Sequence, residues 1–164
     1  MAGVSGTDRA RAVLDAARAR KLRIATAESC TGGLVSAALT TIPGSSDVFD
    51  RGFVTYSYPS KTALLGVPAA LLAGDGAVSE PVARAMAEGA LDRSDADLTV
   101  AITGVAGPGG SEAKPEGMVW FATAGLGDTV SRLEQFGPLG RDTVRDRSVE
   151  TALDLLAQAL ARAP

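Results

Sequence analysis

The feature that most constrains the fold is a continuous run of apolar and β-branched residues near the middle of the chain. Residues Leu98–Thr103 read LTVAIT. Polar and apolar residues do not alternate along this run, which is typical of a strand that is covered on both faces. We therefore expect Leu98–Thr103 to be a central strand with helices packed on both sides.

Helical and extended patterns alternate around this run. Apolar spacing and caps predict helices at Asp8–Lys21 (capped by Thr7 or Asp8), Cys30–Thr41, Glu80–Arg93 and Gly140–Arg162, short helical turns at Pro59–Leu65 and Pro68–Leu72, and strands at Leu22–Ala27, Phe53–Tyr56, Met118–Ala124 and Thr129–Phe136. The last two strands are close enough to form a hairpin. This order predicts an α/β protein, a three-layer α/β/α fold with a mixed, mostly parallel sheet, in a single domain over residues 1–164.

The chain of 164 residues contains no histidine and one cysteine, Cys30. These counts exclude a Ser-His-Asp triad, a Cys-His pair, zinc held by histidine or by several cysteines, and an internal disulfide. Any nucleophile must therefore be activated by a lysine, a tyrosine or a carboxylate. Cys30 has no histidine to activate it, and we interpret it as a buried structural thiol more readily than as a nucleophile.

Charge and hydropathy exclude two further classes of protein. The net charge is −3, and the densest basic stretch, Arg9–Arg23, fits the solvated face of one helix, so we expect no direct binding to nucleic acid. No apolar run is long enough to cross a bilayer, and the N-terminus lacks the apolar core of a signal peptide. A single cysteine fits a reducing compartment. We therefore expect a cytoplasmic protein without membrane contact.

Three polar or glycine-rich segments each follow a predicted strand. They are Glu28–Gly33, Tyr56–Lys61 and Thr103–Gly110. Ligands of open α/β sheets bind at the carboxyl ends of the strands. If the three strands are parallel, the segments converge on one edge of the sheet, which predicts a site there.

The first segment offers a nucleophile and backbone donors. Ser29 stands at a predicted strand-to-helix turn, where the N–H groups of Cys30, Thr31 and Gly32 would face its hydroxyl and favour an oxyanion or a phosphate. Gly32 and Gly33 would allow a ligand to approach the backbone. The alternative is that Ser29 only caps the helix and that the glycines only pack it on the sheet.

The second segment offers a base. A desolvated Lys61 could lose its proton and accept the one from Ser29, and Tyr56, five residues earlier, could relay that proton. Glu28 could orient Lys61 or a substrate amide. Each residue also has a purely structural alternative. Lys61 could be an exposed helix lysine, Tyr56 a core aromatic of its strand, and Glu28 a member of a structural ion pair.

The third segment is a candidate phosphate loop. It contains Thr103, Gly104, Gly107, Gly109 and Gly110, but it lacks the Gly-Lys-Ser/Thr ending of a P-loop. Its length favours a binding function. Arg141 and Arg145 lie four residues apart on the last helix, so both could face one anion, or both could simply be solvated.

Four motifs in order give the chain a family resemblance. They are AESCTGG at 27–33, GFVTYS at 52–57, TGVAGPGG at 103–110 and KPEG at 114–117. Over Arg9–Leu160 the chain resembles the C-terminal domain of the competence/damage-inducible protein CinA, whose stand-alone members are nicotinamide-nucleotide amidohydrolases of the PncC type. The resemblance implies hydrolysis of nicotinamide mononucleotide in pyridine nucleotide salvage. It also implies a homo-oligomer that needs no metal or other cofactor.

The same resemblance implies roles for particular residues. The family's serine, tyrosine and lysine correspond to Ser29, Tyr56 and Lys61, and its glycine-rich loop to residues 103–110. One departure stands out: Tyr58 replaces the family's usual asparagine, and Pro59 follows it. We also expect no counterpart of the large N-terminal domain of full-length CinA.

Two other functions share these motifs. A catalytically silent nucleotide-binding module that acts through protein partners would use the glycine loop but would need no nucleophile. An amidase for another small amide would use Ser29 and Lys61 but would not need the phosphate of the substrate.

Overall fold

The apolar run at the centre of the sequence forms β3 (Leu98–Gly104), the middle strand of a five-stranded sheet. The computed structural model describes residues 3–111 and 113–164. The other strands are β1 (Ile24–Glu28), β2 (Phe49–Val54), β4 (Met118–Gly125) and β5 (Gly127–Gln135), and their order across the sheet is β2-β1-β3-β4-β5. β1 pairs in parallel with both β2 and β3, whereas β3–β4 and β4–β5 are antiparallel, so four of the five strands point the same way.

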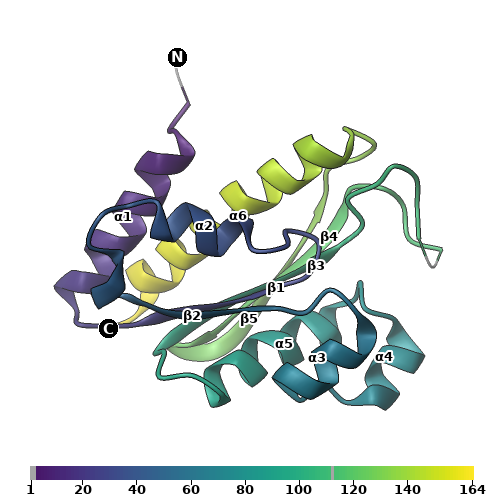
Figure 1. Ribbon diagram of the computed structural model, residues 1–164, viewed down its shortest axis with the longest axis horizontal. Helices are drawn as coiled ribbons and strands as arrows, with labels where there is room; N and C mark the ends of the chain where they lie inside the picture. Colours follow the sequence, from purple (N-terminus) through teal and green to yellow (C-terminus); the bar gives the residue numbers. More distant parts are fainter. Residues whose placement is uncertain (1–2, 112) are drawn as a thin grey trace.

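Helices cover both faces of this sheet (Figure 1). One layer contains α1 (Gly6–Ala19), α2 (Leu34–Thr40) and α6 (Arg141–Arg162), and the other contains α3 (Tyr58–Leu65), α4 (Ala69–Asp75) and α5 (Glu80–Asp92). A short 3-10 helix, η1 (Ser45–Asp47), leads into β2. The predicted three-layer α/β/α architecture with a mixed, mostly parallel sheet is therefore confirmed.

Alternate side chains of the central strands enter two separate cores. Val100 and Ile102 of β3 pack in the core beneath α1 and α6, whereas Ala101 packs in the core beneath α5. The α5 side of the sheet is lined by small residues, namely Ala27, Ala101, Ala122 and Ala124. Small side chains let α5 lie close to the sheet, while the branched residues fill the wider space on the other side.

Three predicted boundaries are wrong. The helix expected from Cys30 begins only at Leu34, because residues 29–33 form a turn in which Gly32 and Gly33 adopt left-handed backbone conformations. The first helix is capped by Ser5, whose side chain accepts from the N–H of Asp8, and not by Thr7 or Asp8. The strand expected at Phe53–Tyr56 lies earlier, at Phe49–Val54. This is an edge strand that contains charged residues, and they interrupt the apolar pattern on which the prediction relied.

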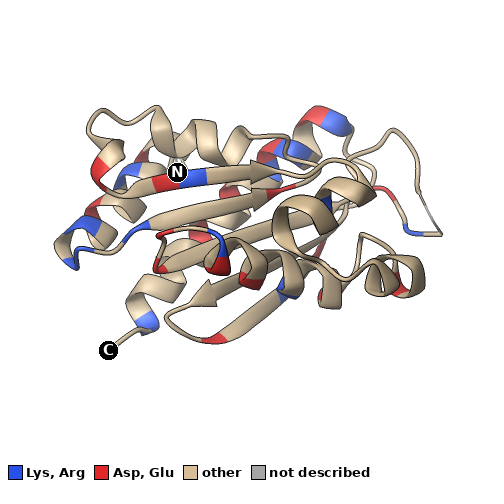
Figure 2. Ribbon diagram, turned by 60° about the horizontal axis from the view of Figure 1, so that its bottom comes forward, with Lys and Arg blue, Asp and Glu red and all other residues tan. Residues whose placement is uncertain are grey.

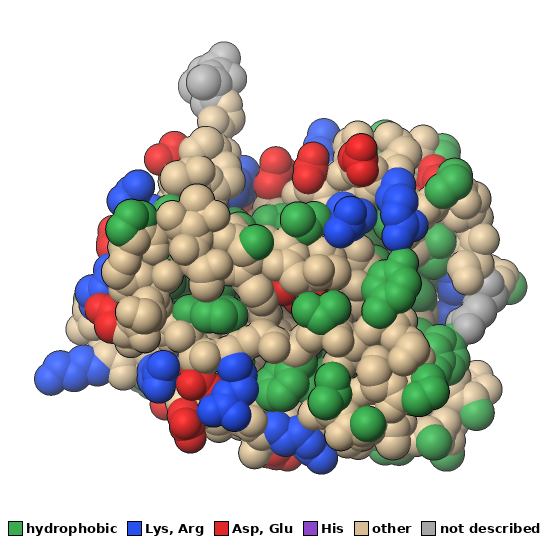
Figure 3. Space-filling view, in the orientation of Figure 1, with side chains coloured by type: hydrophobic (Ala, Val, Ile, Leu, Met, Phe, Trp, Pro, Cys, Tyr) green, Lys and Arg blue, Asp and Glu red, His purple; other side chains and the backbone are tan. Residues whose placement is uncertain are grey.

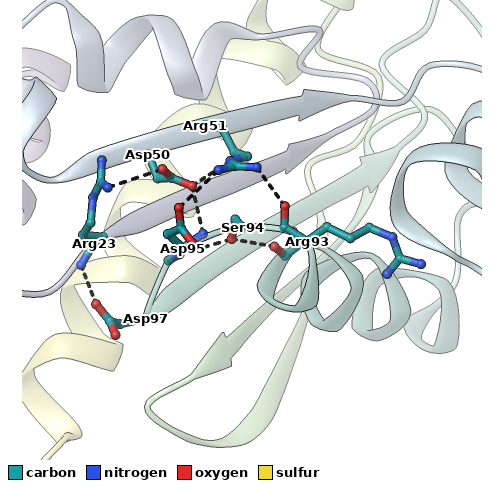
Figure 4. A network of polar contacts seen from close by, with 9 residues as sticks. Arg23, Asp50, Arg51, Arg93, Ser94, Asp95 and Asp97 are labelled. Atoms are coloured by element: carbon teal, nitrogen blue, oxygen red, sulfur yellow. Dashed lines mark hydrogen bonds and ion pairs between the residues drawn. The ribbon is translucent and has the colours of Figure 1, made fainter.

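A network of charged side chains ties together the amino ends of β1, β2 and β3, opposite the predicted site (Figure 4). Asp50 accepts from the backbone N–H of Asp95 and the guanidinium of Arg51, and it pairs with Arg23. Burial raises the pKa of Asp50, but these hydrogen bonds and nearby cations outweigh it and the pKa is lowered. The backbone N–H of Arg23 also donates to the carboxylate of Asp97.

Charges of both signs are mixed over the surface. Figure 2 shows basic and acidic segments interspersed along the helices. On the face in Figure 3, basic (blue) and acidic (red) side chains lie next to each other near the upper edge and at the lower left. Within residues 3–111 and 113–164, no helix is both long enough and apolar enough to cross a membrane.

Candidate active site

The carboxyl ends of β1 and β3 and the segment after β2 meet at a cavity of about 300 Å³. Its lining includes Ser29 and Cys30 from the first predicted segment, Tyr56, Tyr58 and Lys61 from the second, and residues 103–110 from the third. The three segments therefore converge as expected from parallel strands. Arg141, at the start of α6, completes one side of the cavity.

Ser29 lies immediately after β1 and is held by the neighbouring strand. Its backbone N–H donates to the carbonyl of Ile102 in β3 at 3.0 Å, and its side chain is almost buried. The carbonyl of Ser29 accepts from the N–H of Gly32 at 3.0 Å, which closes a tight turn. The N–H of Gly32 is therefore already used, which corrects the expectation that it faces a ligand.

Lys61 reaches Ser29 from α3. Its side chain is 1% exposed, and Nζ lies 2.9 Å from Ser29 Oγ and hydrogen-bonds the carbonyl of Thr55. Burial lowers the pKa of Lys61 from 10.5 to about 8. A lysine that is buried, close to a hydroxyl and easily deprotonated has the properties of a general base.

Cys30 follows Ser29, and its thiol is buried. Burial raises the pKa of this thiol from 9.0 to about 12, although Lys61 and Arg145 act in the opposite direction. A thiolate is the nucleophilic form of cysteine, so this environment suppresses its reactivity. The interpretation of Cys30 as a structural thiol fits this geometry.

Tyr56 lies at the rim of the cavity. Its side chain is 62% exposed, and its hydroxyl accepts from Arg141 Nη2 at 2.8 Å. Arg141 Nη1 donates to the carbonyl of Gly107 at 2.7 Å, so this arginine joins the rim to the glycine-rich loop. The expected contact of Tyr56 with the Ser29–Lys61 pair is thus replaced by a contact with Arg141.

The two arginines of α6 do not share one ligand position. Arg145 donates from Nε to the carbonyl of Cys30 at 3.1 Å and from Nη2 to that of Thr31 at 3.4 Å, whereas Arg141 contacts Tyr56 and Gly107. The expectation that both arginines face one anion is therefore wrong for this arrangement. Helical spacing puts both on one side of α6, but each reaches a different loop.

Glu28 does not face Lys61. Its fully buried carboxylate accepts from the backbone N–H groups of Val35 at 2.9 Å and Ser36 at 3.0 Å, and from Ser36 Oγ at 2.7 Å. Because these N–H groups belong to the first turn of α2, Glu28 caps that helix. This corrects the expectation that Glu28 orients Lys61 or a substrate.

The glycine-rich loop is held by contacts that sequence reasoning missed. Glu116 Oε1 accepts from the N–H of Gly109 at 3.0 Å, and a Cβ on Gly107 would lie 1.8 Å from the same oxygen. A Cβ on Gly110 would lie 2.5 Å from the carbonyl of Lys114. Close packing against residues 114–116 thus leaves little room for a side chain at Gly107 and Gly110, and the KPEG motif was the signal for it.

The segment around Ala77 forms a further wall of the cavity, which the sequence did not indicate. Tyr58 accepts from the N–H of Ala77 at 3.1 Å. Thr103 Oγ1 donates to the carbonyl of Ala77 at 2.8 Å. The backbone N–H and carbonyl of Ala77 are thus both hydrogen-bonded, one by Tyr58 of α3 and the other by Thr103 of β3.

Within the described residues, no group of three or more histidine, cysteine, aspartate or glutamate side chains could hold a metal ion.

Comparison with known proteins places this geometry in a family. The model of the CinA C-terminal domain matches residues 7–160. A putative competence-damage inducible protein of Symbiobacterium thermophilum is 50% identical over 155 residues, which cover 86% of this chain and 35% of that protein. The CinA-like protein of Mycolicibacterium gilvum is 55% identical over 139 residues, which cover 84% and 33%. The chain thus spans about a third of the length of these relatives.

A relative of similar length and a solved structure also match. Nicotinamide-nucleotide amidohydrolase PncC of Escherichia coli K12 is 51% identical over 145 residues, which cover 87% of each chain. The crystal structure of the competence/damage inducible protein CihA from Agrobacterium tumefaciens is 44% identical, covers 99% of this chain and 100% of that one, and superposes with a TM-score of 0.92. Sequence and fold therefore agree that this chain belongs to the family of the CinA C-terminal domain.

Proposed function

We propose that the chain hydrolyses nicotinamide mononucleotide to nicotinic acid mononucleotide and ammonia, as a step of pyridine nucleotide salvage. The observation that carries this proposal is the buried contact of 2.9 Å between Lys61 Nζ and Ser29 Oγ, two residues that line the cavity. The name of the Escherichia coli relative, which matches over most of both chains, supports the choice of substrate.

Lys61 is the base of the proposed reaction. With a pKa of about 8, Lys61 is neutral in roughly a tenth of the molecules at pH 7. A neutral amine that donates one hydrogen to the Thr55 carbonyl can turn its lone pair towards the hydroxyl hydrogen of Ser29. The carbonyl of Thr55 therefore supports the orientation that a general base needs.

The reaction is an acyl transfer in two halves. Ser29 Oγ attacks the carboxamide carbon as Lys61 takes its proton, and backbone N–H groups of the Ser29 turn stabilise the negative oxygen that forms. The C–N bond then breaks, and the leaving nitrogen takes the proton from Lys61 and departs as ammonia. Water, deprotonated by Lys61, attacks the acyl-enzyme and releases the carboxylate and the free serine.

Arg141 and the glycine-rich loop are proposed to hold the phosphate of the substrate. In the described part of the chain, Arg141 contacts a carbonyl and a hydroxyl and forms no ion pair with a carboxylate. Its positive charge is therefore available to an anion at the rim. Tyr56, as the partner of Arg141, is proposed to contact the substrate there.

The test is ammonia release from nicotinamide mononucleotide by the wild type, Ser29→Ala and Lys61→Ala, with Arg147→Gln as a control on the exposed side of α6. We expect activity in the wild type and the control, and its loss in the other two. Activity that survives in both Ser29→Ala and Lys61→Ala would sink the proposal. Tight binding without turnover would indicate a silent binding module, and equal turnover of nicotinamide riboside would indicate an amidase that ignores the phosphate.

A further inference from the structure

The tight turn that carries Ser29 is held from outside by an arginine. Arg145 of α6 donates to the carbonyls of Cys30 and Thr31, the two residues after Ser29. Its Nη2 also packs on the turn, since a Cβ on Gly32 would lie 3.3 Å from it. α6 passes beside the connection from β1 to α2 and thereby brings the guanidinium to the turn (Figure 1).

These two hydrogen bonds set the direction of the backbone N–H groups. In a planar trans peptide, the carbonyl of one residue and the N–H of the next point in opposite directions. Because the carbonyl of Cys30 faces Arg145, the N–H of Thr31 points to the other side of the turn. In the same way, the Thr31 carbonyl faces Arg145 and the N–H of Gly32 points away from it, to the Ser29 carbonyl. Since that hydrogen bond holds the Ser29 carbonyl, it also fixes the direction of the N–H of Cys30 in the same peptide.

The N–H of Cys30 is not used by the rest of the protein. Within residues 3–111 and 113–164, it donates to no other residue. Ser29 and Cys30 line the cavity, whereas Arg145 is absent from the described lining. Arg145 therefore contacts the turn outside the cavity, and the N–H of Cys30 stays available to a ligand.

We propose that Arg145 is a positioning residue, which holds the turn after Ser29 so that the N–H of Cys30, which lines the cavity, faces the oxyanion. This inference rests on the proposed Ser29–Lys61 reaction. Arg145 acts through the backbone and does not touch the substrate. It thereby differs from Arg141, whose guanidinium lies at the cavity.

The first test separates positioning from phosphate binding by steady-state kinetics of ammonia release. For Arg145→Gln we expect kcat to fall about 10- to 100-fold, because a misplaced oxyanion donor stabilises the transition state less, while KM changes less than about twofold. Arg145→Lys keeps the charge but loses the two-pronged geometry, so an intermediate kcat is expected. A raised KM with unchanged kcat would overturn the inference and assign Arg145 to substrate binding.

The second test needs no amide substrate. A fluorophosphonate reacts when Ser29 Oγ attacks phosphorus, the P–F bond breaks, fluoride leaves and Lys61 keeps the serine proton. Intact mass spectrometry measures the labelling rate, with Ser29→Ala as the unlabelled control and Arg147→Gln as the charge-matched control. We expect Arg145→Gln to slow labelling about as much as it lowers kcat, with Arg145→Lys in between.

The outcomes distinguish the two proposals. If the wild type is labelled but releases no ammonia from nicotinamide mononucleotide, the substrate assignment fails, and labelling of the Arg145 variants still decides the role of Arg145. If Arg145→Gln and Arg145→Lys are labelled at the wild-type rate, the positioning role is refuted. A wild type that is not labelled at all also refutes it, since the role requires a reactive Ser29.

Discussion

Replacing Lys61 by methionine should make the protein more stable at pH 7 while abolishing activity. The side chain is among the largest that are fully buried, and its amine hydrogen-bonds only the Ser29 hydroxyl and the Thr55 carbonyl within the described residues. Methionine has a similar length and no charge to desolvate. A residue kept for chemistry at the expense of stability should show this combination.

The magnitude follows from the pKa. The value of Lys61 falls from 10.5 to about 8, so below pH 8 both the folded and the unfolded chain carry the proton, and the folded chain bears the full penalty of about 3 kcal/mol. Between pH 8 and 10.5 only the unfolded chain keeps the proton, so stability rises with pH. Losing the partner of the Thr55 carbonyl costs about 1–2 kcal/mol, which leaves Lys61→Met more stable by about 1–2 kcal/mol at pH 7.

Urea unfolding of the wild type and of Lys61→Met at pH 7 and pH 9 measures this. Titration of Lys61 should stabilise the wild type by about 1.4 kcal/mol between these pH values, so the advantage of the variant shrinks by that amount. Cys30, whose pKa is raised to about 12, is present in both proteins and cancels in the difference. Lys21→Met, at an exposed position, is the control. An advantage that is equal at both pH values would refute the reasoning.

Four further predictions concern activity and stability. Below pH 8, kcat/KM should rise about tenfold per pH unit and then level off, as the base loses its proton; ammonia release from pH 6 to 9 measures it, and a flat profile contradicts it. Glu28→Gln should lower the free energy of unfolding by about 2 kcal/mol in urea titrations, because an amide cannot accept from every donor of the α2 cap. Gly107→Ala should raise KM more than Gly109→Ala, because both have positive φ but only the first meets Glu116. Asp50→Asn should cost about 2 kcal/mol at pH 7 and less near pH 3, because a lowered carboxyl pKa stabilises the fold above its unfolded pKa and ceases to do so as pH falls through the folded value; thermal unfolding at both pH values tests it.

Much of the fold could be predicted from local patterns. The run at Leu98–Thr103 indicates a strand with two covered faces, and the surrounding periodicities indicate the helices, because burial of a face imposes a period on the sequence. Boundaries failed where another force decided. The turn at Ser29–Gly33 replaces a first helical turn because Gly32 and Gly33 adopt left-handed conformations, and β2 was misplaced because ion pairs put charged residues on an edge strand.

The sequence by itself determined which chemistry is available: without histidine, Ser29 can be activated only by a lysine, a tyrosine or a carboxylate, and Lys61 follows the next strand. Only the tertiary structure decided which side chains meet. Ser29 and Lys61 come within 2.9 Å because β1 and β2 are parallel neighbours and α3 folds back under the sheet. Local spacing could not show that Glu28 turns to α2, or that Arg141 and Arg145 separate to different loops. A side chain takes the partner that packing brings within reach, and that partner comes from elements far apart in the chain.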